Sequence, residues 1–329
     1  MDILKTKPAD IEVGVVGIGL MGSSIIVSLL ASGHYVKAIA PIPNDLQGSE
    51  KRITEHLLAC SQTGLFKESV SSCLDRLDIS IDYNRLSNSS LVLECVVEDI
   101  DIKSQVYKKI TDVVLASTVI ASNTSAISIT LLQKLVSIPE RFIGIHWAEP
   151  AYATRFMEIT CGDITNSRYA NWVFNLAHYW GKEPTLLRKD IRGFITNRLM
   201  YAVYREIFYL IENRKTTMDD ADKAFRYDVG SWITLMGIFR RIDYTGLADQ
   251  KEIFKNLFPQ LSNSDNVPGI MQKVVDDNGR GIQNLNGLYS YTSTEAREWE
   301  DAFAAFNKDI FLLASLHPSP LLEKGIGSD

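Results

Sequence analysis

The feature of this sequence that most constrains its fold is the string Gly17-Ile18-Gly19-Leu20-Met21-Gly22, which follows a valine-rich segment and opens an apolar stretch. Glycine at these three positions permits a tight turn, close approach of the backbone to a pyrophosphate, and close packing of a helix on a strand. The amides and the dipole at the start of that helix favour phosphate groups. The string therefore predicts a dinucleotide-binding turn, although a purely structural turn would use the same glycines.

The same region contains no charged residue from Gly14 to Gly33, a stretch long enough to span a bilayer. Its glycines and the serines at positions 23, 24, 28 and 32 fit a strand, a turn and a buried helix better. We therefore expect no membrane segment here.

Short apolar runs alternate with amphipathic segments through the first half of the chain, which is typical of βαβ units and a mostly parallel sheet. The predicted strands cover residues 13–16, 35–39, 91–97, 119–122, 142–146 and 156–160. Helices are predicted over 102–113 and 168–180, together with a helical insertion at about 49–86 that turns near Gly64. The predicted fold of this half is a Rossmann-type, doubly wound α/β domain.

The pattern changes after Pro184, and from Gly193 onward aromatic and leucine residues recur at helical spacing. Further helices are predicted at about 218–225, 246–257, 268–277 and 294–313. A length of 329 residues suits two domains. We place them at residues 1–186 and 187–329, the second being all-helical.

Composition excludes several classes of partner and site. The formal net charge is −6 and no basic stripe offsets it, so a nucleic-acid partner is not expected. The cysteines at 60, 73, 95 and 161 form no CxxC pair and have no histidine cluster nearby, so neither a metal site nor a disulfide framework is expected. The start of the chain lacks the pattern of a signal peptide, which predicts a cytoplasmic protein.

Two polar residues lie on predicted strands where chemistry is expected. His146 ends an apolar strand, and the carboxyl ends of parallel strands face the crevice in which such folds bind ligands. Glu158 lies in the next short strand, and a histidine with a carboxylate makes a workable acid/base pair. A satisfied structural histidine is the alternative. The histidines at positions 34, 56, 178 and 317 lack this setting and are interpreted as structural or surface residues.

Three other polar residues have ordinary explanations when taken singly. Ser125 follows a strand and precedes a helix, so it would serve as a helix cap. Asn197 and Lys103 would be ordinary helix residues.

The end of the predicted strand at 35–39 bears on the choice of cofactor. The strand ends in Ala40, where an acid would hold the adenosine ribose, but no arginine is placed to hold a 2′-phosphate. This favours NAD over NADP.

Taken in order, these segments resemble the L-3-hydroxyacyl-CoA dehydrogenase family. The matching strings are VVGIGLMGSS, LECVVEDIDIKSQVY, IASNTSAISIT, PERFIGIHW, the region of Glu158, IRGFITNRLM and the closing NGLYSY. The resemblance implies an NAD-dependent dehydrogenase of fatty acid metabolism, with a Rossmann-type first domain and a 6-phosphogluconate-dehydrogenase-like helical domain that usually forms a homodimer.

The resemblance also implies roles for individual residues. The positions that match the family's catalytic set are Ser125, His146, Glu158 and Asn197, with His146 as acid/base. The positions that match its NAD site are Gly17, Gly19, Leu20, Met21, Gly22, Glu98, Lys103 and Asn123. The implied substrate is a 3-hydroxyacyl-CoA, in contact with Ser125 and Asn197.

The sequence departs from the family pattern in two places that bear on the substrate. Glu149 replaces the family's asparagine and is a further candidate for substrate contact, either as an ionised group that raises the pKa of His146 or as a protonated hydrogen-bond donor. Around its helical stretch at residues 53–63 the insertion offers Lys51, Arg52 and Lys67 as basic groups, a thin set of contacts for CoA phosphates. Dehydrogenases of free hydroxy acids such as gulonate or carnitine therefore stay open as an alternative, as does a non-catalytic cofactor-binding relative.

Overall fold

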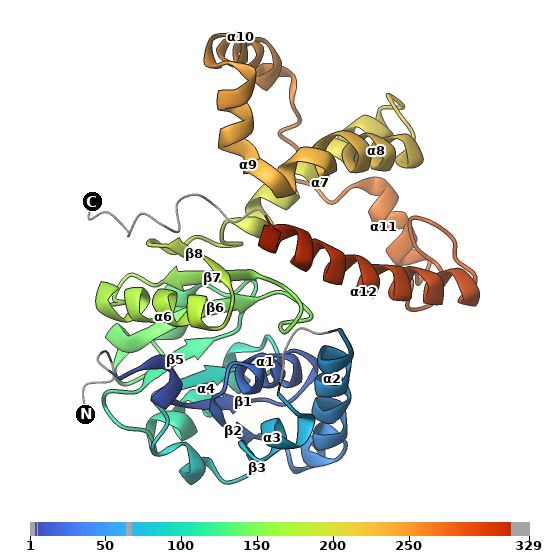
Figure 1. Cartoon of the computed structure of the whole chain (residues 1–329). Coiled ribbons are helices and arrows are strands. Elements are labelled where there is room, and N and C mark those ends of the chain that lie inside the picture. Colours follow the sequence, from blue (N-terminus) through green and yellow to red (C-terminus); the bar gives the residue numbers. More distant parts are fainter. Residues whose placement is uncertain (1–3, 5, 64–67, 317–329) are drawn as a thin grey trace. The chain divides into compact units, whose positions relative to one another are not determined.

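The computed structural model describes residue 4 and residues 6–63 and 68–316 of the chain (Figure 1). The chain forms two compact units, Met1–Thr196 and Asn197–Asp329. The first unit extends beyond Leu186, where the sequence placed the boundary, because Leu186 lies in the last strand of the sheet.

The first unit is built on an eight-stranded sheet with the order β3-β2-β1-β4-β5-β6-β7-β8. The strands are β1 (Glu12–Val16), β2 (Tyr35–Ile39), β3 (Leu77–Ser80), β4 (Leu91–Glu94), β5 (Val119–Ser122), β6 (Phe142–Trp147), β7 (Phe156–Cys161) and β8 (Glu183–Leu187). Only the β6–β7 pair is antiparallel within this sheet. The predicted mostly parallel, doubly wound sheet is confirmed.

Both faces of the sheet are buried, which is why its strands are nearly continuous apolar runs. Along β4, Leu91 and Leu93 pack into one hydrophobic cluster and Val92 into the other. The first cluster includes apolar side chains of α1 (Leu20–Ala31), α2 (Ser49–Thr63) and α6 (Ser167–Tyr179), and the second includes those of α4 (Ile100–Thr111) and α5 (Ile129–Gln133). Helices therefore cover both faces, as the predicted α/β class requires (Figure 1).

Two edge strands differ from the sequence-based expectation. The insertion predicted to be helical contains α2 and α3 (Val70–Leu74), but it also contributes β3, whose residues are all half-buried. At the other edge, β8 includes Pro184, and an edge strand tolerates a proline because it needs hydrogen bonds on one side only. The turn expected near Gly64 lies outside the described residues.

The second unit is helical, as predicted. Its helices are α7 (Thr196–Glu212), α8 (Met218–Ala224), α9 (Gly230–Thr245), α10 (Leu247–Leu257), α11 (Gly269–Asp276) and α12 (Ser293–Leu316). A π-helical turn joins α8 to α9, and α9 bends at Gly237, where φ is 70°. Across the part of the chain that is described, no helix is long and apolar enough to cross a membrane, and the uncharged stretch from Gly14 to Gly33 forms most of β1, a turn and α1.

Candidate active site

The three glycines after β1 have three separable physical roles. Gly17 has φ 98°, and a Cβ there would lie 2.7 Å from the carbonyl group of Cys95. A Cβ on Gly22 would lie 1.8 Å from the carbonyl oxygen of Gly17. A Cβ on Gly19, by contrast, would meet nothing within 4 Å. The turn is thus closed by Gly17 and Gly22 and open at Gly19, the N-cap residue of α1, so the residues fit a pyrophosphate at the helix start.

The insertion contributes a contact to this turn that the sequence did not reveal. Arg52 on α2 donates from Nε to Ser23 Oγ at 3.0 Å and from Nη2 to the carbonyl oxygen of Ile18 at 2.9 Å. These partners are far apart in sequence, so no local pattern indicates them.

Ala40, at the end of β2, lies where the family pattern expects an acid. It is buried, and its amide donates to Ser80 in β3, so this position offers no side-chain group to a ribose.

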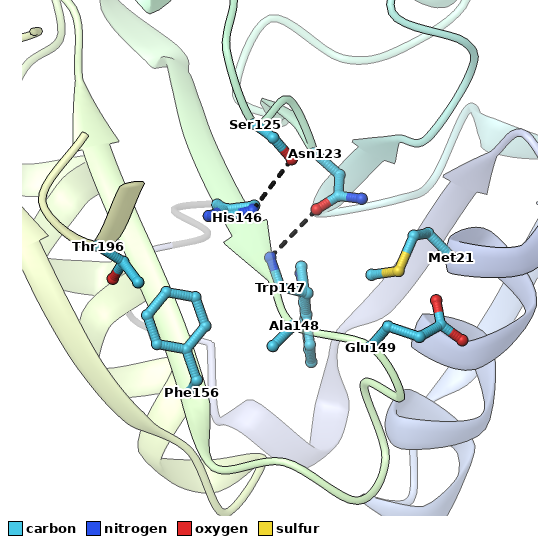
Figure 2. Close-up of a pocket in the computed structure, with 9 residues that line it drawn as sticks. All are labelled: Met21, Asn123, Ser125, His146, Trp147, Ala148, Glu149, Phe156 and Thr196. Atoms are coloured by element: carbon cyan, nitrogen blue, oxygen red, sulfur yellow. Dashed lines mark hydrogen bonds between the residues drawn. The ribbon is translucent and has the colours of Figure 1, made fainter. Parts of the chain in front are cut away.

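The antiparallel pairing of β6 and β7 brings His146 opposite Glu158. The imidazole Nδ1 lies 3.7 Å from Glu158 Oε2, and Nε2 lies 3.1 Å from Ser125 Oγ (Figure 2). Glu158 is fully buried, and its other oxygen accepts the amide hydrogen of Ile195 at 2.6 Å. The structure therefore assembles three of the predicted catalytic residues, with Nε2 of His146 on the side of Ser125.

A pocket of about 380 Å³ opens in front of His146 (Figure 2). Its lining consists of Met21, Asn123, Ser125, His146, Trp147, Ala148, Glu149, Phe156 and Thr196. Asn123 Oδ1 accepts the amide hydrogen of Trp147 at 3.1 Å, which ties the end of β6 to the loop after β5. The sequence reasoning missed Phe156, although strand alternation places it on the same face as Glu158.

Glu149 lines the same pocket. Figure 2 shows its carboxylate pointing away from the imidazole of His146. Glu149 is exposed to solvent, and desolvation in the pocket raises the pKa of its carboxyl above the ordinary value. Both roles considered for this residue stay predictions.

The other predicted site residues lie in different surroundings. Glu98 contacts the loop that carries Ser125, and Lys103 is fully buried with its ammonium on Glu94 and Glu98. Leu20 is exposed at the start of α1. Asn197 belongs to the second unit, so its approach to the reacting oxygen stays a prediction.

The contacts test the structural roles considered for Ser125 and His34. Ser128, not Ser125, caps α5 by accepting the amide hydrogen of Leu131 at 3.2 Å, so the capping role considered for Ser125 is wrong. His34 is buried and its Nε2 accepts from the indole of Trp180 at 2.8 Å, which confirms its structural role. His317 lies outside the described residues.

Comparison with known proteins agrees with this geometry. The chain matches family models for the 3-hydroxyacyl-CoA dehydrogenase NAD binding domain over residues 12–191 and for the C-terminal domain over residues 193–291. It is 30% identical over 288 residues to 5-formyl-3-hydroxy-2-methylpyridine 4-carboxylate 5-dehydrogenase of Mesorhizobium japonicum, covering 87% of this chain and 92% of that protein. It is 29% identical over 289 residues to the mitochondrial hydroxyacyl-coenzyme A dehydrogenase of Sus scrofa, covering 85% and 91%.

Solved structures give the same result. A crystal structure of 5-formyl-3-hydroxy-2-methylpyridine 4-carboxylic acid 5-dehydrogenase, described as an NAD+ dependent dismutase, aligns with a TM-score of 0.86 and 26% identity, over 93% of this chain and 99% of that one. The glycine turn, the matched NAD-binding domain and these relatives identify NAD as the cofactor. The chain therefore belongs to the 3-hydroxyacyl-CoA dehydrogenase family, whose members are NAD-dependent oxidoreductases that act on CH–OH groups.

Proposed function

We propose that this enzyme oxidises the hydroxyl group of a small free hydroxy acid, with His146 as the acid/base. The main support for a free acid is what the basic side chains of the insertion contact. CoA carries several phosphates, which proteins bind with clustered cationic and amide donors. Arg52 is instead bonded to the glycine turn, and Arg76 to Glu68 and the carbonyl oxygen of Leu30, whereas Lys51 and Arg85 lie on the surface with a carboxylate oxygen 3.8 and 3.7 Å away. Lys67 lies outside the described residues.

The side chains divide the proton chemistry among them. In the oxidative direction His146 Nε2 accepts the hydroxyl proton, because Nδ1 is buried and faces Glu158. The Glu158 carboxylate stabilises the resulting imidazolium and holds the ring in place. Ser125 Oγ, 3.1 Å from Nε2, positions the reacting oxygen by a hydrogen bond. NAD, when bound, accepts the hydride from the carbon.

The preference for an acid rests on Glu149. Desolvation raises the pKa of its carboxyl, and in the protonated form Glu149 would donate a hydrogen bond to a substrate carboxylate. Asparagine, which the family carries at this position, would also donate from its amide. A relative that acts on a pyridine carboxylate, at 30% identity over most of the chain, supports a free acid as substrate.

The test compares NAD-dependent turnover of free hydroxy acids, and of 5-formyl-3-hydroxy-2-methylpyridine 4-carboxylate, with that of 3-hydroxybutyryl-CoA. We expect kcat/KM for the best free acid to exceed that for the thioester by about tenfold or more, which corresponds to about 1.4 kcal/mol. In His146→Ala, kcat should fall by about 10²- to 10⁴-fold while NADH binding is retained. Equal rates in the wild type and in this variant would refute the mechanism.

A 3-hydroxyacyl-CoA is the second candidate substrate. The family models and the 29% identity to a hydroxyacyl-coenzyme A dehydrogenase favour it. Thermal stabilisation of the NAD complex by CoA esters, and not by free acids, would decide for this alternative.

A further inference from the structure

We propose that Glu98 is a positioning residue that holds the loop after β5 so that Ser125 meets His146. One oxygen of Glu98, Oε1, accepts hydrogen bonds from the amide of Ser125 at 3.1 Å and from the amide of Ala126 at 3.3 Å. The same oxygen accepts a hydrogen bond from the hydroxyl of Thr124. Three successive residues of the loop therefore donate to one carboxylate oxygen, and the residue in the middle is the one that contacts the imidazole.

The second oxygen of Glu98 forms an ion pair with a buried ammonium group. Oε2 lies 3.3 Å from Nζ of Lys103, a residue with no exposed side-chain surface. The same ammonium contacts both oxygens of Glu94 at 2.8 and 2.9 Å. Glu94 is itself fixed by the hydroxyls of Tyr107 and Ser122, each at 2.7 Å. A rigid network thus runs from the end of β4 to the loop of Ser125.

The charges of this network support Glu98 as an acceptor. Burial acts to raise the pKa of Glu98, but the hydrogen bond from Thr124 and the charge of Lys103 outweigh it, so the pKa is lowered. An ionised carboxylate accepts stronger hydrogen bonds than a neutral group. Thr124 extends the effect, because its Oγ1 also accepts the amide hydrogen of Ile127 at 3.0 Å.

The loop needs this support because the cap of the following helix lies further on, at Ser128. Without Glu98 the amides of Ser125 and Ala126 lose the acceptor that orients them, and the Ser125 hydroxyl moves relative to His146. Lys103 keeps its partner Glu94, so the buried charge stays balanced and the domain stays folded. Glu98 therefore acts on catalysis through Ser125, an inference that rests on the proposed role of Ser125 in the reaction.

A double-mutant cycle tests this coupling, with Glu98→Ala, Ser125→Ala and the double variant, and with Glu98→Gln in case the alanine variant does not fold. We expect Glu98→Ala to lower kcat, measured at saturating cofactor, by about 10- to 100-fold. In the Ser125→Ala background the same change should have almost no further effect. Asp99→Asn is the matched control, since Asp99 is the adjacent carboxylate and caps α4 instead.

Three outcomes would overturn the proposal. Additive losses in the cycle would show that Glu98 does not act through Ser125. Weaker NADH binding with kcat unchanged at saturation would make Glu98 a cofactor ligand only. Crystal structures of the wild type and of Glu98→Ala supply a readout that needs no substrate: retention of the 3.1 Å contact between Ser125 Oγ and His146 Nε2 in the variant would also refute the proposal. If no hydroxy compound is turned over, the proposed function fails, while this structural comparison still decides the role of Glu98.

Discussion

Glu149 lines the pocket in front of His146, and its proposed role as a hydrogen-bond donor makes a prediction about pH. Its pKa is raised by desolvation, so the protonated form persists to a higher pH than for an ordinary glutamate. If this form donates to a substrate carboxylate, KM for a hydroxy acid should rise as the pH increases through the Glu149 pKa. In Glu149→Gln, which keeps a donor but cannot ionise, KM should stay flat between about pH 5 and pH 8.

Initial-rate measurements on the wild type, Glu149→Gln and Glu149→Leu would check this. The leucine variant should show a raised KM at every pH, because it has no donor. Parallel KM profiles in the wild type and the glutamine variant would exclude the donor role of Glu149.

His34 makes a residue-level prediction about stability. Burial, assisted by the charge of Arg76, lowers the pKa of His34 from 6.5 to about 4. The unfolded chain therefore binds a proton that the folded chain excludes between these two values. The free energy of unfolding is fully retained above pH 6.5 and decreases as the pH falls towards 4. The shift from 6.5 to about 4 corresponds to a loss of about 3 kcal/mol.

Urea unfolding of the wild type and of His34→Gln across this pH range would measure the effect. Glutamine keeps an acceptor for the indole of Trp180 but does not titrate in this range. The variant should lose less stability on acidification than the wild type. Identical pH dependence in both proteins would contradict the assignment.

At the scale of elements, substitutions in the turn between β1 and α1 should affect protein stability and cofactor binding separately. Gly22→Ala places a methyl group 1.8 Å from the Gly17 carbonyl and should lower the free energy of unfolding by about 1 to 3 kcal/mol. Gly19→Ala meets no protein atom within 4 Å, so its stability should change by less than about 1 kcal/mol. Because this methyl group occupies the open side of the turn, we expect NADH to bind about tenfold more weakly.

Fluorescence titration gives the dissociation constant of NADH for each variant, and denaturant unfolding gives its free energy of unfolding. The prediction fails if Gly19→Ala binds NADH as tightly as the wild type does.

How far the sequence predicts each element follows from the kind of interaction that forms it. The β1–α1 turn was predictable because its glycines and apolar periodicity are local. The central strands were predictable because both of their faces are buried. The edge strands β3 and β8 were not, since half-buried residues and Pro184 leave no clear periodic signal.

The same distinction applies to the site. The placement of His146 at a strand end was visible in the sequence, but the contacts of Glu98 with the Ser125 loop and of Arg52 with the glycine turn join segments that only the fold brings together.

At the scale of the whole molecule, the second unit exposes much apolar surface. No residue of α7, α8, α9, α10 or α11 is buried. Large apolar side chains such as Phe239 (83% exposed) and Tyr244 (76%) lie on α9. Exposed apolar surface of this extent marks an interaction site in a soluble protein. We propose that a second copy of the chain covers it, in line with the homodimer that the family resemblance implies.

Light scattering should give a mass of about twice the 36.9 kDa of the single chain. Phe239→Glu should weaken self-association by about tenfold or more, because it places a charge on the apolar surface. Ile81→Glu is the matched control, since Ile81 is also an exposed apolar residue but lies in the first unit. A monomeric wild type at micromolar concentration would rule out the dimer.

The pairing of β6 with β7 has a consequence for how such an enzyme can change its repertoire. His146 and Glu158 face each other through the hydrogen-bond ladder, whereas Glu149 sits on the hairpin connection between them. If Glu149 contacts the substrate as proposed, replacements in that connection would change which molecule is recognised while His146 and Glu158 stay paired in the sheet. The same reaction would then serve a new substrate after changes in one short loop.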